Sequence, residues 1–137
     1  MIKIKVGSNK NTLYIFDFDD TIRDSKTGKE LECAKILKDK QSKGLPAIIL
    51  TGNPETTFIE EYLKKHKFKD IEILSSFGVE KQDEIETSSA KKKLLKKYLK
   101  DKSFSKVYFY DDQEDNLEKI KQLEDELNIK VYTKKPK

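Results

Sequence analysis

Three carboxylates that follow an apolar run near the N-terminus are the residues of this chain best suited to chemistry. The run at 13–16 leads directly into Asp17, Asp19 and Asp20. Clustered acids repel one another unless a cation lies among them, and hard oxygen ligands favour Mg²⁺. In an extended chain, residues two apart point the same way, so Asp17 and Asp19 are expected to face a common site. The alternative is a strand that ends in a solvated acidic turn.

Asp111 and Asp112 form a second acidic group, behind another apolar run at 107–110. An aspartate there also suits the N-terminus of a helix, where it caps free N–H groups. Because ligands bind beyond the carboxyl ends of the strands in an open α/β sheet, the two acidic groups are expected to meet at one edge. That meeting favours a metal ligand over a simple helix cap.

Thr51 and Gly52 end a third apolar run, at 46–50, and lead through Asn53 into an expected helix. The threonine hydroxyl, the backbone N–H groups and the helix dipole together suit a phosphate group. The same residue types are common in an ordinary strand-to-helix cap. Both interpretations stay open for this element taken alone.

Lys91 is a charged residue on a helix face that is otherwise apolar. At about 100° per residue, the helix expected at 87–100 has one apolar face, which consists of Ala90, Leu94, Leu95, Tyr98 and Leu99. Lys91 falls near the middle of this face, whereas Lys92 and Lys93 fall outside it. A lysine on a core-facing stripe is costly unless it is paired. We therefore expect Lys91 to reach the carboxylates or a bound phosphate; the alternative is a lysine whose amine extends to solvent without a role.

Apolar runs and helical patterns alternate along the chain from residue 13 onward. This alternation predicts an α/β protein with a three-layer, Rossmann-like fold, in which a mostly parallel five-stranded sheet has helices on both faces. The expected strands are 13–16, 46–51, 71–74, 106–111 and 129–133, and the expected helices are 30–43, 55–66, 87–100 and 116–127. A half-exposed strand at 2–6 and an irregular segment at 75–86 complete the pattern. Residues 1–133 are expected to form a single domain, followed by a basic, disordered tail at 134–137.

Two details of the expected helices follow from individual residues. Gly44 is expected to end the helix at 30–43 in a left-handed conformation. The helix at 55–66 is expected to turn four side chains inward, namely Phe58, Ile59, Tyr62 and Leu63. Pro54 suits the first turn of that helix, where its missing N–H costs nothing.

Composition limits the partners and the location. The chain has 137 residues and a net charge of +4 carried almost wholly by lysine, and Cys33 is its single cysteine, so no disulfide can form within it. The charge mildly favours polyanionic partners but falls short of the basic stripe of a dedicated nucleic-acid binder. No apolar run reaches membrane-spanning length and no signal peptide is evident, so we expect a cytoplasmic monomer with no membrane partner.

The order of these parts resembles that of the haloacid dehalogenase (HAD) superfamily of phosphohydrolases. The matching segments are DFDDT at 17–21, IILT at 48–51, the helix-borne Lys91, and YDD at 110–112. The resemblance covers nearly the whole chain, and it implies a core with no cap domain, because the segments at 22–29 and 75–86 are too short to hold one. It implies that Asp17 is the nucleophile, which forms an aspartyl-phosphate.

The resemblance also implies roles for the remaining polar residues. Asp19 is the general acid and base, and Thr51 and Lys91 hold the phosphoryl oxygens. Mg²⁺ is held by the carboxylate of Asp17, the backbone carbonyl of Asp19 and the carboxylate of Asp112, with Asp111 in support.

A narrower resemblance is to the capless nucleic-acid-repair branch, which includes the phosphatase domain of polynucleotide kinase. The segment from Thr87 through Lys91 to YDDQED at 110–115 is similar to signatures of an RNA-repair-like group. The chain departs from that branch at Asn53 and Gln113, where an arginine often stands. The resemblance implies a phosphorylated substrate, with a DNA or RNA end as the leading candidate. A small-molecule (nucleotide) phosphatase and a non-catalytic phosphate-binding protein of the same fold are the alternatives.

The residues alone also support phosphoryl transfer. A carboxylate such as Asp17 can attack phosphorus and divide a difficult hydrolysis into two easier steps. A second carboxylate two residues on, Asp19, can protonate the leaving oxygen. A receiver domain of a signalling relay also uses acids, threonine and lysine around a sheet, but its lysine follows the last acids, whereas Lys91 precedes Asp111.

Overall fold

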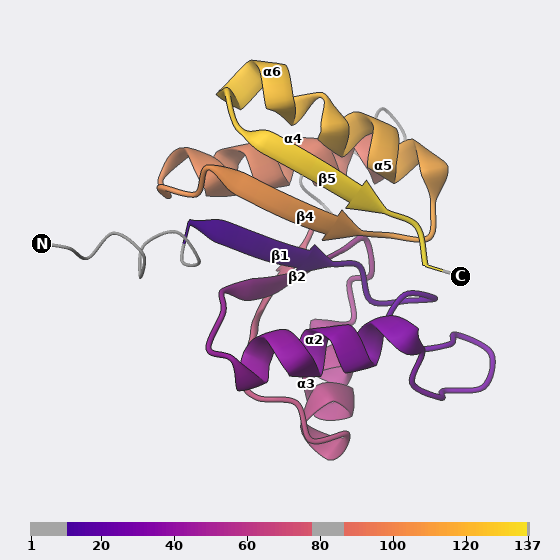
Figure 1. Ribbon diagram of the computed structural model, residues 1–137. Helices are drawn as coiled ribbons and strands as arrows, with labels where there is room; N and C mark the ends of the chain where they lie inside the picture. Colours follow the sequence, from indigo (N-terminus) through magenta and orange to yellow (C-terminus); the bar gives the residue numbers. More distant parts are fainter. Residues whose placement is uncertain (1–10, 78–86, 137) are drawn as a thin grey trace, which may run out of the picture.

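The computed structural model describes residues 11–77 and 87–136, which build one five-stranded sheet (Figure 1). The strands are β1 (Thr12–Phe16), β2 (Ala47–Thr51), β3 (Glu72–Ser75), β4 (Lys106–Tyr110) and β5 (Lys130–Lys134). They lie in the order β3-β2-β1-β4-β5, and every neighbouring pair is parallel. The expected α/β class and the five-stranded sheet are confirmed.

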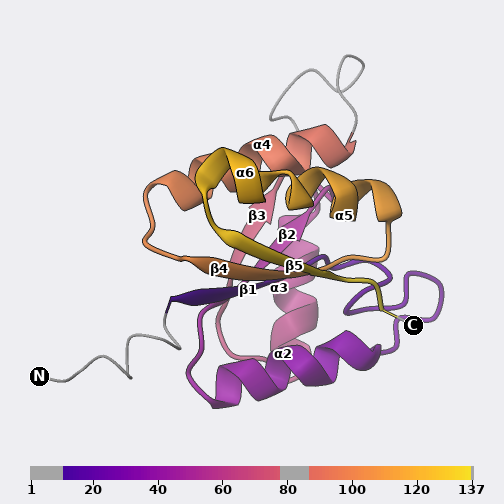
Figure 2. The same ribbon diagram turned by 45° about the horizontal axis from the view of Figure 1, so that its top comes forward.

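Helices cover both faces of the sheet, which gives three layers (Figure 2). On one side lie α2 (Glu32–Ser42) and α3 (Thr56–Lys65), and on the other lie α4 (Thr87–Lys100), α5 (Glu114–Lys121) and α6 (Leu123–Leu127). This is the Rossmann-like arrangement that alternating strands and helices predict. The strand expected at 2–6 and most of the segment expected to be irregular, at 78–86, lie outside the described residues.

Alternation along the strands divides the core in two. On β1, Leu13 and Ile15 pack toward α4 and α5, whereas Phe16 packs toward α2 and α3. Each of these three side chains is at most 1% exposed. The central strand is therefore buried on both faces, as a continuous apolar run predicts, and it holds the acids that follow it in a defined place.

Helix α2 ends at the glycine that the sequence indicates. Gly44 has a φ of +70°, in the left-handed region that glycine enters without steric cost. The N–H of Gly44 donates to the carbonyl oxygen of Gln41, and the N–H of Leu45 donates to that of Lys40, both at 3.0 Å. This pair of bonds satisfies carbonyl groups at the helix end and directs the chain into β2.

The helix expected at 116–127 differs from the structure at both its start and its middle. It begins at Glu114, because acidic residues in the first turn interact well with the helix dipole. It is divided at Gln122, whose N–H bonds to the carbonyl of Lys119, three residues back, at 3.2 Å. The tighter turn separates α5 from α6.

Two further expectations are corrected by contacts with distant residues. Phe58 is 41% exposed rather than inward, and its ring lies 5.0 Å from the guanidinium of Arg23. The last strand continues through Lys134, whose carbonyl oxygen accepts the N–H of Asp111 at 3.2 Å. The first residue of the expected tail is therefore part of the sheet.

The strand order places a topological switch point between β1 and β4. These strands are neighbours, but the chain leaves β1 toward α2 on one face and leaves β4 toward α5 on the other. The loops that follow the two strands therefore diverge. In open α/β sheets, ligands bind outside the carboxyl ends of the strands at such a point.

Candidate metal and phosphate site

Acids from two neighbouring strands meet at the switch point. The parallel register pairs Phe16 with Tyr110, so the residues that follow them, Asp17 and Asp111, are also neighbours. The N–H of Asp17 donates to the carbonyl oxygen of Tyr110 at 2.9 Å, which continues the ladder by one residue. One carboxylate oxygen each from Asp17, Asp111 and Asp112 all lie within 4.8 Å of one another. Asp17, from the first acidic group of the sequence, thus forms one cluster with Asp111 and Asp112 of the second.

Lys91 lies between the two buried acids, on the inner face of α4. Its ammonium donates to Asp17 Oδ1 and to Asp111 Oδ2, at 2.9 Å each. The side chain is 3% exposed, whereas that of Lys92 is 20% exposed and pairs with Glu126 on the surface. The inward position expected from the helical period is confirmed. Burial of this charge is tolerated because two carboxylates pair with it.

Asp111 is held by three donors. Its Oδ2 accepts bonds from Lys91 and from Asn116 Nδ2, each at 2.9 Å, and its Oδ1 accepts the N–H of Gln113 at 2.8 Å. Because both oxygens are engaged, Asp111 is better suited to orient Lys91 than to coordinate an ion. The contribution of Asn116 is not evident from the sequence, where the one signal is a polar residue on the buried side of α5.

Asp17 and Asp112 are the carboxylates best placed to hold a cation. Asp17 is 6% exposed, and its Oδ2 has a long contact of 3.4 Å with the hydroxyl of Thr21. Asp112 is partly exposed and accepts a bond from Gln113 Nε2 at 3.3 Å. Together with Asp111, these side chains form an oxygen-rich donor set that fits a hard divalent cation.

Burial and charge shift the pKa values of the cluster. Burial raises the pKa of Asp17 to about 7; the ammonium of Lys91 opposes this increase, and Asp111 adds to it. Burial lowers the pKa of Lys91, but Asp17 and Asp111 outweigh that effect, so the pKa lies above its ordinary value. The pKa of Asp112 is also raised, first by burial and then by Asp111. The cluster therefore favours added positive charge, from a proton or from a bound cation.

The carboxylate of Asp19 is not one of the three that lie within 4.8 Å of one another, and it has partners of its own. The strand ends one residue before Asp17, and the chain then turns, with Asp20 at a φ of +62°. The carboxylate of Asp19 accepts a bond from Asn53 Nδ2 at 2.9 Å, lies 3.9 Å from Arg23 Nη1, and is 36% exposed. Residues two apart share a direction only in extended backbone, so the turn that follows β1 gives the Asp19 carboxylate contacts different from those of Asp17.

Thr51 and Gly52 lie at the end of β2, beside β1 in the sheet. Thr51 is 1% exposed, and its hydroxyl oxygen accepts the N–H of Asn53 at 3.0 Å. This bond is of the kind expected for an ordinary strand-to-helix cap, the alternative to a phosphate-binding role for Thr51. It uses the hydroxyl as an acceptor, so the hydroxyl hydrogen can still donate to a ligand. Asn53 also accepts the N–H of Glu55 and bonds Asp19, which connects the loops after β1 and β2.

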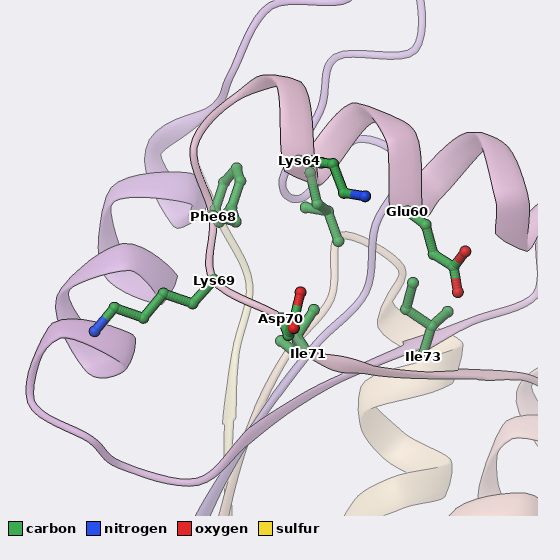
Figure 3. Close-up of a pocket in the computed structure, with 8 residues that line it drawn as sticks. Glu60, Lys64, Phe68, Lys69, Asp70, Ile71 and Ile73 are labelled. Carbon is green, nitrogen blue, oxygen red and sulfur yellow. The ribbon is translucent and has the colours of Figure 1, made fainter.

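A cavity of about 310 Å³ lies between α3 and β3, and none of the clustered acids lines it. Figure 3 shows side chains of α3, of the following loop and of β3 facing one another, among them Glu60, Phe68, Asp70 and Ile73. Its walls carry charges of both signs. The cavity is therefore separate from the candidate site.

The fold and the cluster define a class of protein: an α/β domain with a lysine-bridged acidic site at the carboxyl edge of a parallel sheet. Comparisons with protein-family models, with curated proteins and with solved structures gave no match. Among the described helices, none has the length and apolar character needed to cross a bilayer. The function is therefore inferred from the site itself.

Proposed function

We propose that this protein is a Mg²⁺-dependent phosphomonoester hydrolase of the HAD type. The observation that carries the proposal is Lys91 held by Asp17 and Asp111 at 2.9 Å, with Asp112 beside them. A nucleophile, a phosphate ligand and metal ligands then occur at one point, as phosphoryl transfer requires. These are also the residues to which the resemblance gives catalytic roles.

Asp17 is the proposed nucleophile. Its carboxylate attacks phosphorus, the bond from phosphorus to the leaving oxygen breaks, and an aspartyl-phosphate forms. Water then attacks that phosphorus, which releases phosphate and returns the free carboxylate. Lys91 orients the carboxylate of Asp17 through a hydrogen bond to Oδ1. Its ammonium also opposes the increase that burial causes in the pKa of Asp17, which favours the reactive anion.

Charge on the transferring phosphoryl group is balanced from two directions. Asp17 and Asp112 are the side chains that would hold Mg²⁺, with the backbone carbonyl of Asp19 as the resemblance implies. When bound, the ion supplies positive charge that lets an anionic nucleophile meet an anionic phosphate. Lys91 contributes its ammonium beside Asp17, where it can bond a phosphoryl oxygen. Asp111 does not react but holds Lys91 in place.

Asp19 is the proposed general acid and base. It donates a proton to the leaving oxygen in the first step and takes one from water in the second, which is typically worth about 10²–10⁴-fold in rate. Asn53 and Arg23 hold its carboxylate, and its 36% exposure leaves it accessible to a substrate.

A phosphorylated DNA or RNA end is the substrate we propose. The segments at 22–29 and 75–86, where a cap domain could be inserted, are too short to form one. An uncapped site surrounds little of a small metabolite, so binding energy must come from a larger partner. The excess of lysine favours a polyanion over a neutral partner.

Hydrolysis of an aryl phosphate tests the catalytic proposal. We expect Asp17→Asn to abolish turnover while it leaves the fold intact, because asparagine is nearly isosteric but a poor nucleophile. Lys91→Ala should cost more activity than Lys92→Ala, since only Lys91 is buried in the cluster. Turnover by Asp17→Asn at the wild-type rate would refute the nucleophile. Phosphate binding by the wild type without any turnover would identify the non-catalytic alternative.

A second measurement tests the substrate class. The kcat/KM for a 3′- or 5′-phosphorylated oligonucleotide is compared with that for a mononucleotide at low and high salt. We expect the oligonucleotide to have the higher kcat/KM at low salt. This preference should fall as the salt concentration rises, because counterion release then becomes less favourable. A mononucleotide processed equally well, without salt dependence, would indicate a small-molecule phosphatase instead.

A further inference from the structure

The face of the sheet on the side of α2 carries aromatic side chains that the proposed reaction does not use. The register aligns Tyr14, Tyr108 and Tyr132 across β1, β4 and β5, and we name these three residues the tyrosine row. Helices α2 and α3 pack on β1, β2 and β3. On the edge strand β5, Tyr132 is 41% exposed. The tyrosine row thus extends from under α2 to an accessible edge.

The rings of the tyrosine row form a stack that is closed at one end and open at the other. The ring centroids are 5.3 Å apart between Tyr14 and Tyr108 and 4.8 Å apart between Tyr108 and Tyr132, with interplanar angles of 16° and 21°. The ammonium of Lys40, on α2, lies 4.6 Å from the centroid of Tyr14 and covers that end. Within the described parts of the chain, Tyr132 has a ring contact with Tyr108 alone. Its outer side can accept one more flat ring.

Lysines surround the open end of the tyrosine row. Lys130 and Lys134 lie two residues before and after Tyr132 on β5, so all three share one face at intervals of about 7 Å. Lys106 is the register neighbour of Lys130 on β4. Lys130 interacts with Glu124, whereas Lys106 and Lys134 form no salt bridge with an acid in the described residues. The open ring is thus flanked by positive charge.

We propose that this face binds single-stranded nucleic acid, with one base stacked on Tyr132 and the neighbouring phosphates at Lys130 and Lys134. Stacking accepts any base and lysine follows the backbone, so affinity without sequence preference is expected. A second copy of the chain is disfavoured as the occupant because it would bring like charges together.

This inference deepens the proposed function. Binding of nucleic acid does not depend on that function, but hydrolysis of the phosphate at the end of the bound nucleic acid does. Strand β5 carries Lys134, and the carbonyl of Lys134 accepts the N–H of Asp111 at 3.2 Å. A nucleic acid along β5 therefore lies beside the strand ends where the acids meet. The face supplies binding energy outside the reacting centre, which an uncapped site needs.

Fluorescence anisotropy of a labelled, unphosphorylated oligo(dT) of about 12 nucleotides tests binding without turnover. We expect Tyr132→Ala to weaken binding at least about fivefold, the lower limit for loss of one base stack. Tyr132→Phe keeps the ring and should bind as the wild type does. The double variant Lys130→Ala/Lys134→Ala should reduce the slope of log Kd against log salt by about 1.4, from about 0.7 for each phosphate contact on a single strand.

Matched controls are available on α4, on the other side of the sheet. Tyr98→Ala removes a tyrosine that lies outside the tyrosine row and has the ammonium of Lys102 4.4 Å from its ring centroid. Lys97→Ala/Lys100→Ala removes two exposed lysines. Both controls should bind oligo(dT) as the wild type does, and circular dichroism melting confirms that each variant is folded.

Three outcomes would overturn the proposal: no binding of oligo(dT) by the wild type, equal loss in the Tyr132 and Tyr98 variants, or self-association in sedimentation that Tyr132→Ala abolishes. Aryl phosphate hydrolysis, measured in parallel, separates the two proposals. Binding as expected without hydrolysis would refute the phosphatase and retain this surface. Hydrolysis without oligo(dT) binding would refute this binding surface and retain the phosphatase.

Discussion

Replacing Lys91 with methionine removes the ammonium that lies between the buried carboxylates of Asp17 and Asp111. The side chains of Lys91, Asp17 and Asp111 are 3%, 9% and 0% exposed, and both ion pairs measure 2.9 Å. Breaking a buried pair by removing one partner costs about 3–5 kcal/mol, because the remaining charge is left uncompensated. Since domains are typically stable by about 5–15 kcal/mol, the Mg²⁺-free variant should lose a large part of its stability.

Urea unfolding at pH 8, followed by circular dichroism, measures this loss. Lys92→Met is the matched control, since Lys92 is adjacent on α4 and pairs with Glu126 on the surface; its cost should be under about 1 kcal/mol. Adding Asp17→Asn to Lys91→Met should recover part of the loss, because it removes one of the two unpaired charges. If Lys91→Met and Lys92→Met cost the same, or if Asp17→Asn brings no recovery, the reasoning about the bridge is refuted.

Three further predictions concern Mg²⁺ binding, the pKa of Asp17 and the left-handed turn at Gly44. Mg²⁺ at about one hundred times its Kd should stabilise the protein by about 2.7 kcal/mol in thermal unfolding at matched ionic strength. The Asp112→Asn variant should lose this stabilisation, and the variant of the exposed Asp115, Asp115→Asn, should keep it. Equal stabilisation of the two variants would contradict the metal site. Burial raises the pKa of Asp17 from 3.8 to about 7, so its contribution to the stability of the Mg²⁺-free protein is full below pH 3.8 and is lost as the pH rises through 7. Urea unfolding of the wild type and Asp17→Asn across that range should show the wild type losing stability relative to the variant, and a constant difference would contradict the raised pKa. Gly44→Ala should destabilise by about 1–2 kcal/mol, because φ is +70° and an added Cβ meets no atom within 4 Å, so the cost is conformational; an unchanged urea midpoint would contradict it.

The strands and helices could be predicted because the spacing of apolar residues along the chain indicates them. Each strand expected between residues 13 and 133 is present, and the helix expected at 87–100 has those bounds. The same period placed Lys91 on the buried side of that helix, where it is found. These features depend on residues within a few turns of one another, so sequence is sufficient for them. The errors at Phe58 and Gln122 arise where a tertiary contact or a tightened turn outweighs the period.

That acids end two buried strands, and that Lys91 faces inward, could be inferred from the order of residues alone. Which of these side chains meet could not, because it depends on how the strands pair. Pairing of β4 with β1 brings Asp111 beside Asp17, and the turn after β1 brings Asp19 within hydrogen-bond distance of Asn53. The tyrosine row depends in the same way on the register of β1, β4 and β5. Strand order and register result from packing between residues far apart in the chain, and a local pattern does not encode that packing.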